Sequence, residues 1–157
     1  MELVARSPEA VRIAVLARAV TKRPILIAEP RYLSPDYFRS LRSEEGVLSN
    51  PRAEDYRSAP VGVTEAFAAV ARTGSVCVDI GAGITGYVSL LPRLHMVVVD
   101  VDRLVFRPSD LFRLEQFARP TFQRNFVFIS GPSATADMGP LVHGVHGPHE
   151  LHIMVLC

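Results

Sequence analysis

Small and polar residues gather near the end of the chain, between two apolar runs at residues 126–129 and 151–156. Each run has the length and composition of a buried strand, and glycine-proline turns follow the first run and precede the second. This order predicts strand, turn, short helix, turn and strand. Because α/β proteins bind ligands at the carboxyl ends of strands, the turns form a candidate site. Its candidate ligand-binding residues are Gly131, Ser133, Thr135, Gly144 and Gly147.

The predicted short helix begins near Ser133 and Thr135, where free backbone N–H groups and the positive helix end favour a phosphate or carboxylate. Residues 125–157 contain no lysine or arginine, so a bound anion depends on backbone N–H groups or on basic residues from elsewhere. Asp137 either caps this helix or accepts a hydrogen bond from a ligand hydroxyl. Capping alone also explains serine, threonine and aspartate here, but the second glycine-proline turn favours a site.

Four histidines recur every three residues: His143, His146, His149 and His152. Imidazole is a common metal ligand, but glycines and a proline interrupt any helix that would align the four on one face. In an extended chain a spacing of three alternates sides, and no cysteine or acidic residue stands at metal-site spacing, so we expect no metal site. His146 lies between glycines and is a candidate for proton transfer, with Asp137 as the second catalytic candidate.

A glycine-rich segment from Gly81 to Gly86 matches the dinucleotide-binding pattern G-x-G-x-x-G, with Asp100 following at about the expected ~20 residues. The segment also looks like the opening motif of S-adenosylmethionine-dependent methyltransferases. The distance to Pro92 is too short for a helix that connects parallel strands, and Ile84 adds one residue to the methyltransferase spacing. The alternative is a loop whose glycines let the backbone pass close to a neighbouring element.

A turn with two hydroxyl groups, formed by Thr73, Gly74 and Ser75, is expected between a helix over residues 64–74 and a strand over residues 75–79. The turn is either a plain helix end or a further part of the ligand site. Cys77 lies inside the predicted strand, and we expect its thiol to be buried and unreactive.

The composition is that of a compact globular protein, with 157 residues, 48% hydrophobic and 21% charged. A formal net charge of +1 argues against nucleic acid or an anionic membrane surface as a partner. No apolar run approaches the ~20 residues of a membrane-spanning helix. The two cysteines do not make a disulfide framework, so we expect a cytoplasmic protein.

Helical segments and apolar strands alternate along the chain and predict an α/β fold, an open and mostly parallel sheet with helices on both faces. A serine, a proline and an acidic residue in succession mark the start of the first helix. The other expected elements are a helix over residues 109–118 and strands over residues 25–28, 95–99 and 103–106.

Residues 29–60 form the longest connection between predicted elements, with a short helix expected from about residue 34 to residue 42. A connection of this length is a lid, a partner surface or a partly disordered segment in many proteins. The simpler interpretation is a surface connection packed by its aromatic residues, which are Tyr32, Tyr37, Phe38 and Tyr56.

The closing stretch resembles the LUD-domain family, typified by lactate-utilization protein C, whose pattern runs roughly GPSxTAD, LVxGVHGP and LHV before an apolar strand. The matching residues are Gly131, Pro132, Ser133, Thr135, Ala136, Asp137, Leu141, Val142, Gly144, Val145, His146, Gly147, Pro148, Leu151 and His152. Residues 62–76 and 89–99 match more loosely, so the resemblance covers roughly residues 61–157. The chain departs from the family at residues 138–140, where an acidic residue is usual, and at Arg72, which replaces a glutamate.

The resemblance implies a single LUD-like domain over residues 1–157, with the NagB/RpiA/CoA transferase-like fold of CoA transferases and sugar-phosphate isomerases. It implies an accessory component of a multi-protein system that oxidises L-lactate to pyruvate, with a pocket for a small carboxylate or phosphate. Iron-sulfur clusters are expected on partner proteins, since two cysteines cannot hold a four-thiolate cluster, and no cofactor is identified on this chain. Two alternatives remain: an enzyme acting on a phosphorylated or CoA-linked small molecule, and a protein that binds S-adenosylmethionine or a dinucleotide through residues 81–86.

Overall fold

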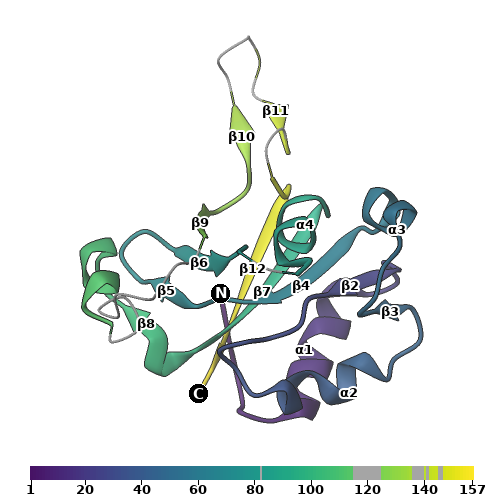
Figure 1. The fold of residues 1–157 in the computed structure, drawn as a ribbon, viewed down its shortest axis with the longest axis horizontal. Coiled ribbons are helices and arrows are strands. Elements are labelled where there is room, and N and C mark those ends of the chain that lie inside the picture. The colour runs from purple at the N-terminus through teal and green to yellow at the C-terminus, as the bar shows by residue number, and fades with distance from the viewer. Residues whose placement is uncertain (82, 115–124, 136–139, 141, 145–146) are drawn as a thin grey trace.

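The computed structural model describes residues 1–81, 83–114, 125–135, 140, 142–144 and 147–157. Its centre is a six-stranded sheet in which all neighbouring strands are parallel (Figure 1). The order across the sheet is β1 (Glu2–Val4), β12 (Glu150–Leu156), β7 (Leu94–Asp100), β4 (Val61–Glu65), β2 (Ile25–Ile27) and β3 (Val47–Leu48). The predicted mostly parallel sheet is therefore confirmed.

One face of the large sheet is covered by α1 (Pro8–Ala19), the 3-10 helix η1 (Pro35–Phe38) and α2 (Arg39–Arg42) (Figure 1). Alternate side chains of the strands point to this face, where they bury an apolar cluster that includes Val15 and Phe38. The burial of these apolar side chains is what holds the helices on the sheet.

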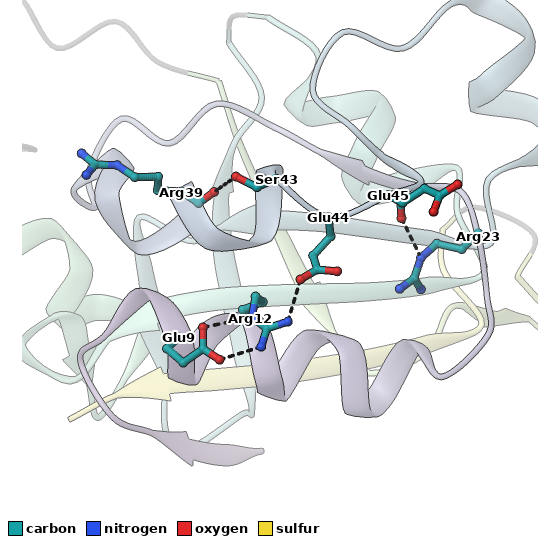
Figure 2. A network of polar contacts seen from close by, with 7 residues as sticks. All are labelled: Glu9, Arg12, Arg23, Arg39, Ser43, Glu44 and Glu45. Atoms are coloured by element: carbon teal, nitrogen blue, oxygen red, sulfur yellow. Dashed lines mark hydrogen bonds and ion pairs between the residues drawn. The ribbon is translucent and has the colours of Figure 1, made fainter.

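The start of α1 follows from its sequence. The Ser7 side chain accepts a hydrogen bond from the Ala10 N–H at 3.1 Å, and Pro8 occupies the first helical position, as predicted. From the next turn, Arg12 contacts Glu9 and Glu44, each at 2.6 Å (Figure 2). The second of these ion pairs connects α1 to the chain that follows α2.

The opposite face is covered by α3 (Ala53–Ser58), by α4 (Thr85–Leu90) and by a smaller sheet (Figure 1). Val88 of α4 packs with Leu26 of β2, and both side chains are fully buried. Next to α4, side chains of β7 and β12 pack against the smaller sheet in a second apolar cluster. Helices therefore lie on both faces, as predicted.

The smaller sheet has the order β8 (Leu104–Val105), β5 (Ala68–Val70), β6 (Ser75–Asp79) and β9 (Phe126–Ser130). It contradicts the helix predicted over residues 64–74, because these residues complete β4, form β5 and turn into β6. All residues of β4 and β5 are buried, so packing between the two sheets outweighs the helix propensity of this alanine-rich segment.

The prediction of a short helix that begins near Ser133 and Thr135 is also wrong at that starting point. Residues Ala134–Thr135 form strand β10, which pairs antiparallel with β11, Val142–His143, in a hairpin that projects from the body of the molecule (Figure 1). The candidate site therefore has a strand where a positive helix end was expected.

Residues 29–60 are a packed surface connection that contains η1, α2, β3 and α3, with Phe38 fully buried. The short helix expected at residues 34–42 is present as η1 and α2. The strand predicted at residues 103–106 is β8, preceded by the 3-10 helix η2 (Val101–Arg103). Of the helix predicted over residues 109–118, the described part is the 3-10 helix η3 (Pro108–Arg113), and the rest lies largely outside the described residues.

Candidate functional site

Three hydroxyl groups from two distant segments form a chain of short contacts. Because β6 pairs antiparallel with β9, Ser75 lies opposite Ser130 in the register of the sheet. The two side-chain oxygens are 2.5 Å apart, and Thr73 Oγ1 lies 2.6 Å from the Ser75 oxygen. Each hydroxyl can donate or accept, so a ligand can set the direction of the whole chain of hydrogen bonds. We call these three residues the hydroxyl ladder.

Two of the predicted glycines lie next to the hydroxyl ladder. Gly74 and Gly131 have φ values of +64° and +72°, in the left-handed region that favours glycine. Both line a pocket of about 340 Å³ together with Ser75. The remaining lining is mostly apolar and includes Leu104 and Ile153. Gly74 is thus the turn residue of the β5–β6 hairpin and not a helix end.

The two glycine-proline turns of the closing stretch lie against each other. The Ser133 N–H donates to the Pro148 carbonyl at 2.9 Å, and the Gly144 N–H donates to the Ser133 carbonyl at 2.7 Å. Ser133, Gly147 and Pro148 line a second pocket of about 180 Å³, which Gly131 also lines. Because the Ser133 and Gly144 N–H groups already have acceptors, side-chain hydroxyls are the better donors to a ligand here.

Gly144 is needed for a packing reason. A Cβ atom at this position would lie 2.1 Å from His149 Nε2, and the φ value is +77°. The histidine ring therefore packs directly on the glycine backbone. Thr135 lies farther out, in β10, where it pairs with Val142.

The structure thus brings Gly74, Ser75 and Gly131 to one pocket, and Gly131, Ser133 and Gly147 to an adjacent one. Thr73 lines neither pocket and is connected to the first through its contact with Ser75. The two candidate catalytic residues, Asp137 and His146, lie outside the described residues.

Among the described residues there is no group of three or more histidines, cysteines or acidic residues that could hold a metal ion. Within the same part of the chain, no helix is long and apolar enough to cross a membrane.

Two buried carboxylates were not recognised from the sequence. Glu65, at the end of β4, accepts hydrogen bonds from the backbone N–H groups of residues 31–33 and so fixes the loop after β2. Burial raises the pKa of Glu65, although these N–H donors oppose the shift. Asp79, at the end of β6, accepts from the Tyr32 hydroxyl at 2.7 Å and the Gly81 N–H at 2.9 Å. The sequence contained a signal for both buried carboxylates, since each acidic residue directly follows a run of mostly apolar strand residues.

A buried histidine was also missed. His95 in β7 is fully buried, and its Nε2 lies 2.9 Å from Thr64 Oγ1 in β4. Burial lowers the pKa of His95 to about 3, so the ring is neutral at physiological pH. In the described part of the chain, its Nδ1 has no hydrogen-bond partner.

The segment from Gly81 to Gly86 lacks the context of a dinucleotide site. It follows β6, which pairs antiparallel with both of its neighbours, whereas the dinucleotide fingerprint requires a parallel strand-helix-strand unit. The helix that follows, α4, has 6 residues. Asp100 forms an ion pair with Arg6 at 2.7 Å and caps η2. The glycines instead let the chain pass from the smaller sheet to α4.

Comparison with known proteins identifies several relatives. Lactate utilization protein C of Halalkalibacterium halodurans is 36% identical over 99 residues, which are 60% of this chain and 43% of that protein. Lactate utilization protein B of Bacillus pumilus is 27% identical over 107 residues, 66% of this chain and 21% of that protein. An uncharacterised electron transport protein of Escherichia coli is 28% identical over 109 residues, with 66% and 21% covered. The chain therefore spans less than half the length of these relatives.

A crystal structure of a DUF162-family protein from Deinococcus radiodurans shares the α/β fold, with a TM-score of 0.68 and 20% identity over 99% of this chain and 86% of that one. The narrower likeness to CoA transferases and sugar-phosphate isomerases stays a prediction. The sequence model of the LUD-domain family matches residues 39–156. This match begins earlier in the chain than residue 61, where the recognised motifs begin. With most of its length covered by that match, the chain belongs to the LUD-domain family.

Proposed function

We propose that this chain is an accessory component of a multi-protein system that oxidises L-lactate to pyruvate, and that it binds a small carboxylate. The names of the relatives support a role in lactate utilization, because they include lactate utilization proteins B and C and an electron transport protein. We assign ligand binding to this chain and electron transfer to its partner proteins.

The observation that carries the binding proposal is the pairing of β6 with β9, which joins the two turns that resemble the family motifs. The hydroxyl ladder lies at this junction, and hydroxyl groups donate to carboxylate oxygens. The nearby pocket of about 180 Å³ is smaller than the ~300–1,000 Å³ typical of drug-sized ligands, and it suits a molecule such as lactate.

The cysteines support the assignment of electron transfer to partner proteins. A cluster held by cysteines takes about four thiolates, and this chain has two cysteines. Cys77 is buried inside β6, and burial raises the pKa of its thiol to about 12, which disfavours the thiolate. The residues of this chain therefore do not fit an iron-sulfur cluster, and we assign the clusters to the partners.

Calorimetric titration with L-lactate and with pyruvate tests the binding proposal. We expect binding to the unmodified protein and a loss of about tenfold or more in Ser130→Ala/Ser133→Ala, because both residues line the pocket of about 180 Å³ and their hydroxyls are the proposed donors to the charged ligand. Ser58→Ala is the matched control, since the Ser58 hydroxyl donates to carbonyls of its own helix α3 and Ser58 lines neither pocket near the hydroxyl ladder. Equal affinity in all three proteins would show that the site lies elsewhere.

A turnover assay separates the accessory component from an enzyme. We expect lactate-dependent reduction of an electron acceptor only when the partner proteins of the system are added to this chain. The enzyme alternative assigns proton transfer to His146 and Asp137 and predicts turnover of a phosphorylated or CoA-linked compound by the isolated chain. Turnover that is lost in His146→Ala/Asp137→Ala, with binding retained, would favour that alternative.

A further inference from the structure

A separate polar pocket of about 490 Å³ lies at the carboxyl edge of the large sheet, where parallel α/β sheets bind ligands. Glu29 and Arg31 reach it from the loop after β2, and Ser49 and Asn50 from the chain after β3. Thr85, at the start of α4, lines its other side. None of these residues lines the two pockets near the hydroxyl ladder, so this edge pocket is a different candidate site.

Arg31 is held in place but keeps hydrogen-bonding capacity. Its backbone N–H is bound by the buried Glu65 carboxylate, and its Nη1 lies 3.4 Å from Asp79 Oδ2. This distance exceeds the ~2.7–2.9 Å of a strong charge-assisted bond, while Asp79 makes shorter bonds to Tyr32 and Gly81. The Arg31 side chain is about 37% exposed, so its guanidinium is a positioned but weakly neutralised cation at the pocket wall.

The other lining groups do not form a purely cationic site. Glu29 is 65% exposed and pairs with Arg42 at 2.7 Å, which offsets its negative charge while leaving oxygen lone pairs for acceptance. Serine, asparagine and threonine side chains both donate and accept. An arginine beside side chains that accept hydrogen bonds, or both donate and accept them, complements a ligand with one anionic group and several hydroxyls. The volume lies within the ~300–1,000 Å³ range of organic ligands larger than lactate.

We propose that the edge pocket binds a polyhydroxylated small anion, whose carboxylate or phosphate contacts Arg31 and whose hydroxyls contact Glu29 and Asn50. Sugar acids and sugar phosphates share this chemistry. Arginine suits both groups, because its planar fork of N–H donors binds two oxygens of either at once.

Calorimetric titration of the full chain with gluconate and with ribose 5-phosphate tests the proposal, with ribose as the uncharged probe. We expect one of the two anions to bind and ribose not to bind. The anion that binds shows whether the pocket recognises a carboxylate or a phosphate. Arg31→Gln should weaken binding by at least about tenfold, because it removes a charged donor. Arg113→Gln is the matched control, since Arg113 is 85% exposed and lines none of the pockets described here.

Arg31→Gln keeps the backbone N–H that Glu65 binds, so we expect it to fold. Asn50→Ala, at an exposed position, is a second variant and should weaken binding about threefold or more. Absence of binding by both anions at 10 mM would overturn the proposal, as would equal affinity in Arg31→Gln and Arg113→Gln. Ser130→Ala/Ser133→Ala should leave this binding unchanged, because neither residue lines the edge pocket. The lactate proposal and the edge-pocket proposal can therefore fail independently.

Discussion

His95 predicts a specific dependence of stability on pH. The ring is fully buried and its pKa is lowered to about 3 by burial, whereas an exposed histidine titrates near 6.5. Below pH 6.5 the unfolded chain therefore binds a proton that the folded chain does not bind until about pH 3. Since the unfolded state binds more protons in this window, the free energy of unfolding falls as the pH falls.

The size of the effect follows from one proton. Each pH unit between the two pKa values lowers the free energy of unfolding by about 1.4 kcal/mol, so His95 accounts for a loss of about 2 kcal/mol between pH 7 and pH 5. Thr64→Val/His95→Leu removes both members of the buried hydrogen bond together. Replacing both partners by apolar groups avoids leaving an unpaired donor or acceptor and should cost little stability at pH 7.

Urea unfolding at several pH values from 7 to 5 provides the measurement. We expect the double variant to lose about 2 kcal/mol less stability over this range than the unmodified protein. All other titrating groups are common to both proteins, so they cancel in the difference. Ser58→Ala, at an exposed position and without a titrating side chain, should retain the full pH dependence. Identical slopes in the unmodified protein and the double variant would show that the His95 ring can be protonated in the folded state, and would refute the reasoning.

Three further predictions concern packing, the loop after β2 and the cysteines. Gly62→Ala places a Cβ 2.0 Å from the Val88 carbonyl oxygen and should destabilise the protein by about 3 kcal/mol, measured by chemical unfolding; a near-neutral change would contradict this close contact of α4 and β4. Glu65→Gln weakens the acceptor of the backbone N–H groups after β2 and should cost about 2 kcal/mol in the same assay, with no loss if the loop is held by other contacts. A thiol reagent should label Cys157 in the folded protein and Cys77 only after unfolding, because Cys77 is buried with a pKa raised to about 12; rapid labelling of both would contradict its burial.

Local signals predicted elements whose ends are marked by particular residues. Ser7 and Pro8 define the start of α1, and the apolar runs of β7 and β12 define two central strands. The segment over residues 64–74 failed because alanine favours a helix when nothing else decides, whereas here the side chains of Ala66 and Ala69 lie in the cluster between the two sheets. Small residues suit that close packing, and this reason is not visible in a local window of sequence.

The residues of the candidate site stay a prediction, and their arrangement could not be read from the sequence. The family motifs pointed to the Thr73–Ser75 turn and to the turn that begins at Gly131, yet nothing in their spacing shows that Ser75 faces Ser130. That contact depends on the pairing of β6 with β9, which joins segments 55 residues apart. Strand β10 stands where a helix end was expected, so our binding proposal uses hydroxyl donors instead of the free backbone N–H groups of a helix. The contact of Arg31 with Asp79 was hidden for the same reason, because the two residues are 48 positions apart in the sequence.

The position of β12 has a consequence for synthesis of the protein on the ribosome. β12 lies between β1 and β7, so an interior strand of the large sheet is made from residues 150–156, about 150 residues after β1. At about 5–20 residues per second, β1 emerges roughly ten seconds or more before its partner strand exists. During that interval the edges of β1 and β7 are unpaired, and unpaired strand edges are templates for aggregation. Chaperones that protect nascent chains should therefore affect the yield of this protein until β12 has been released from the ribosome.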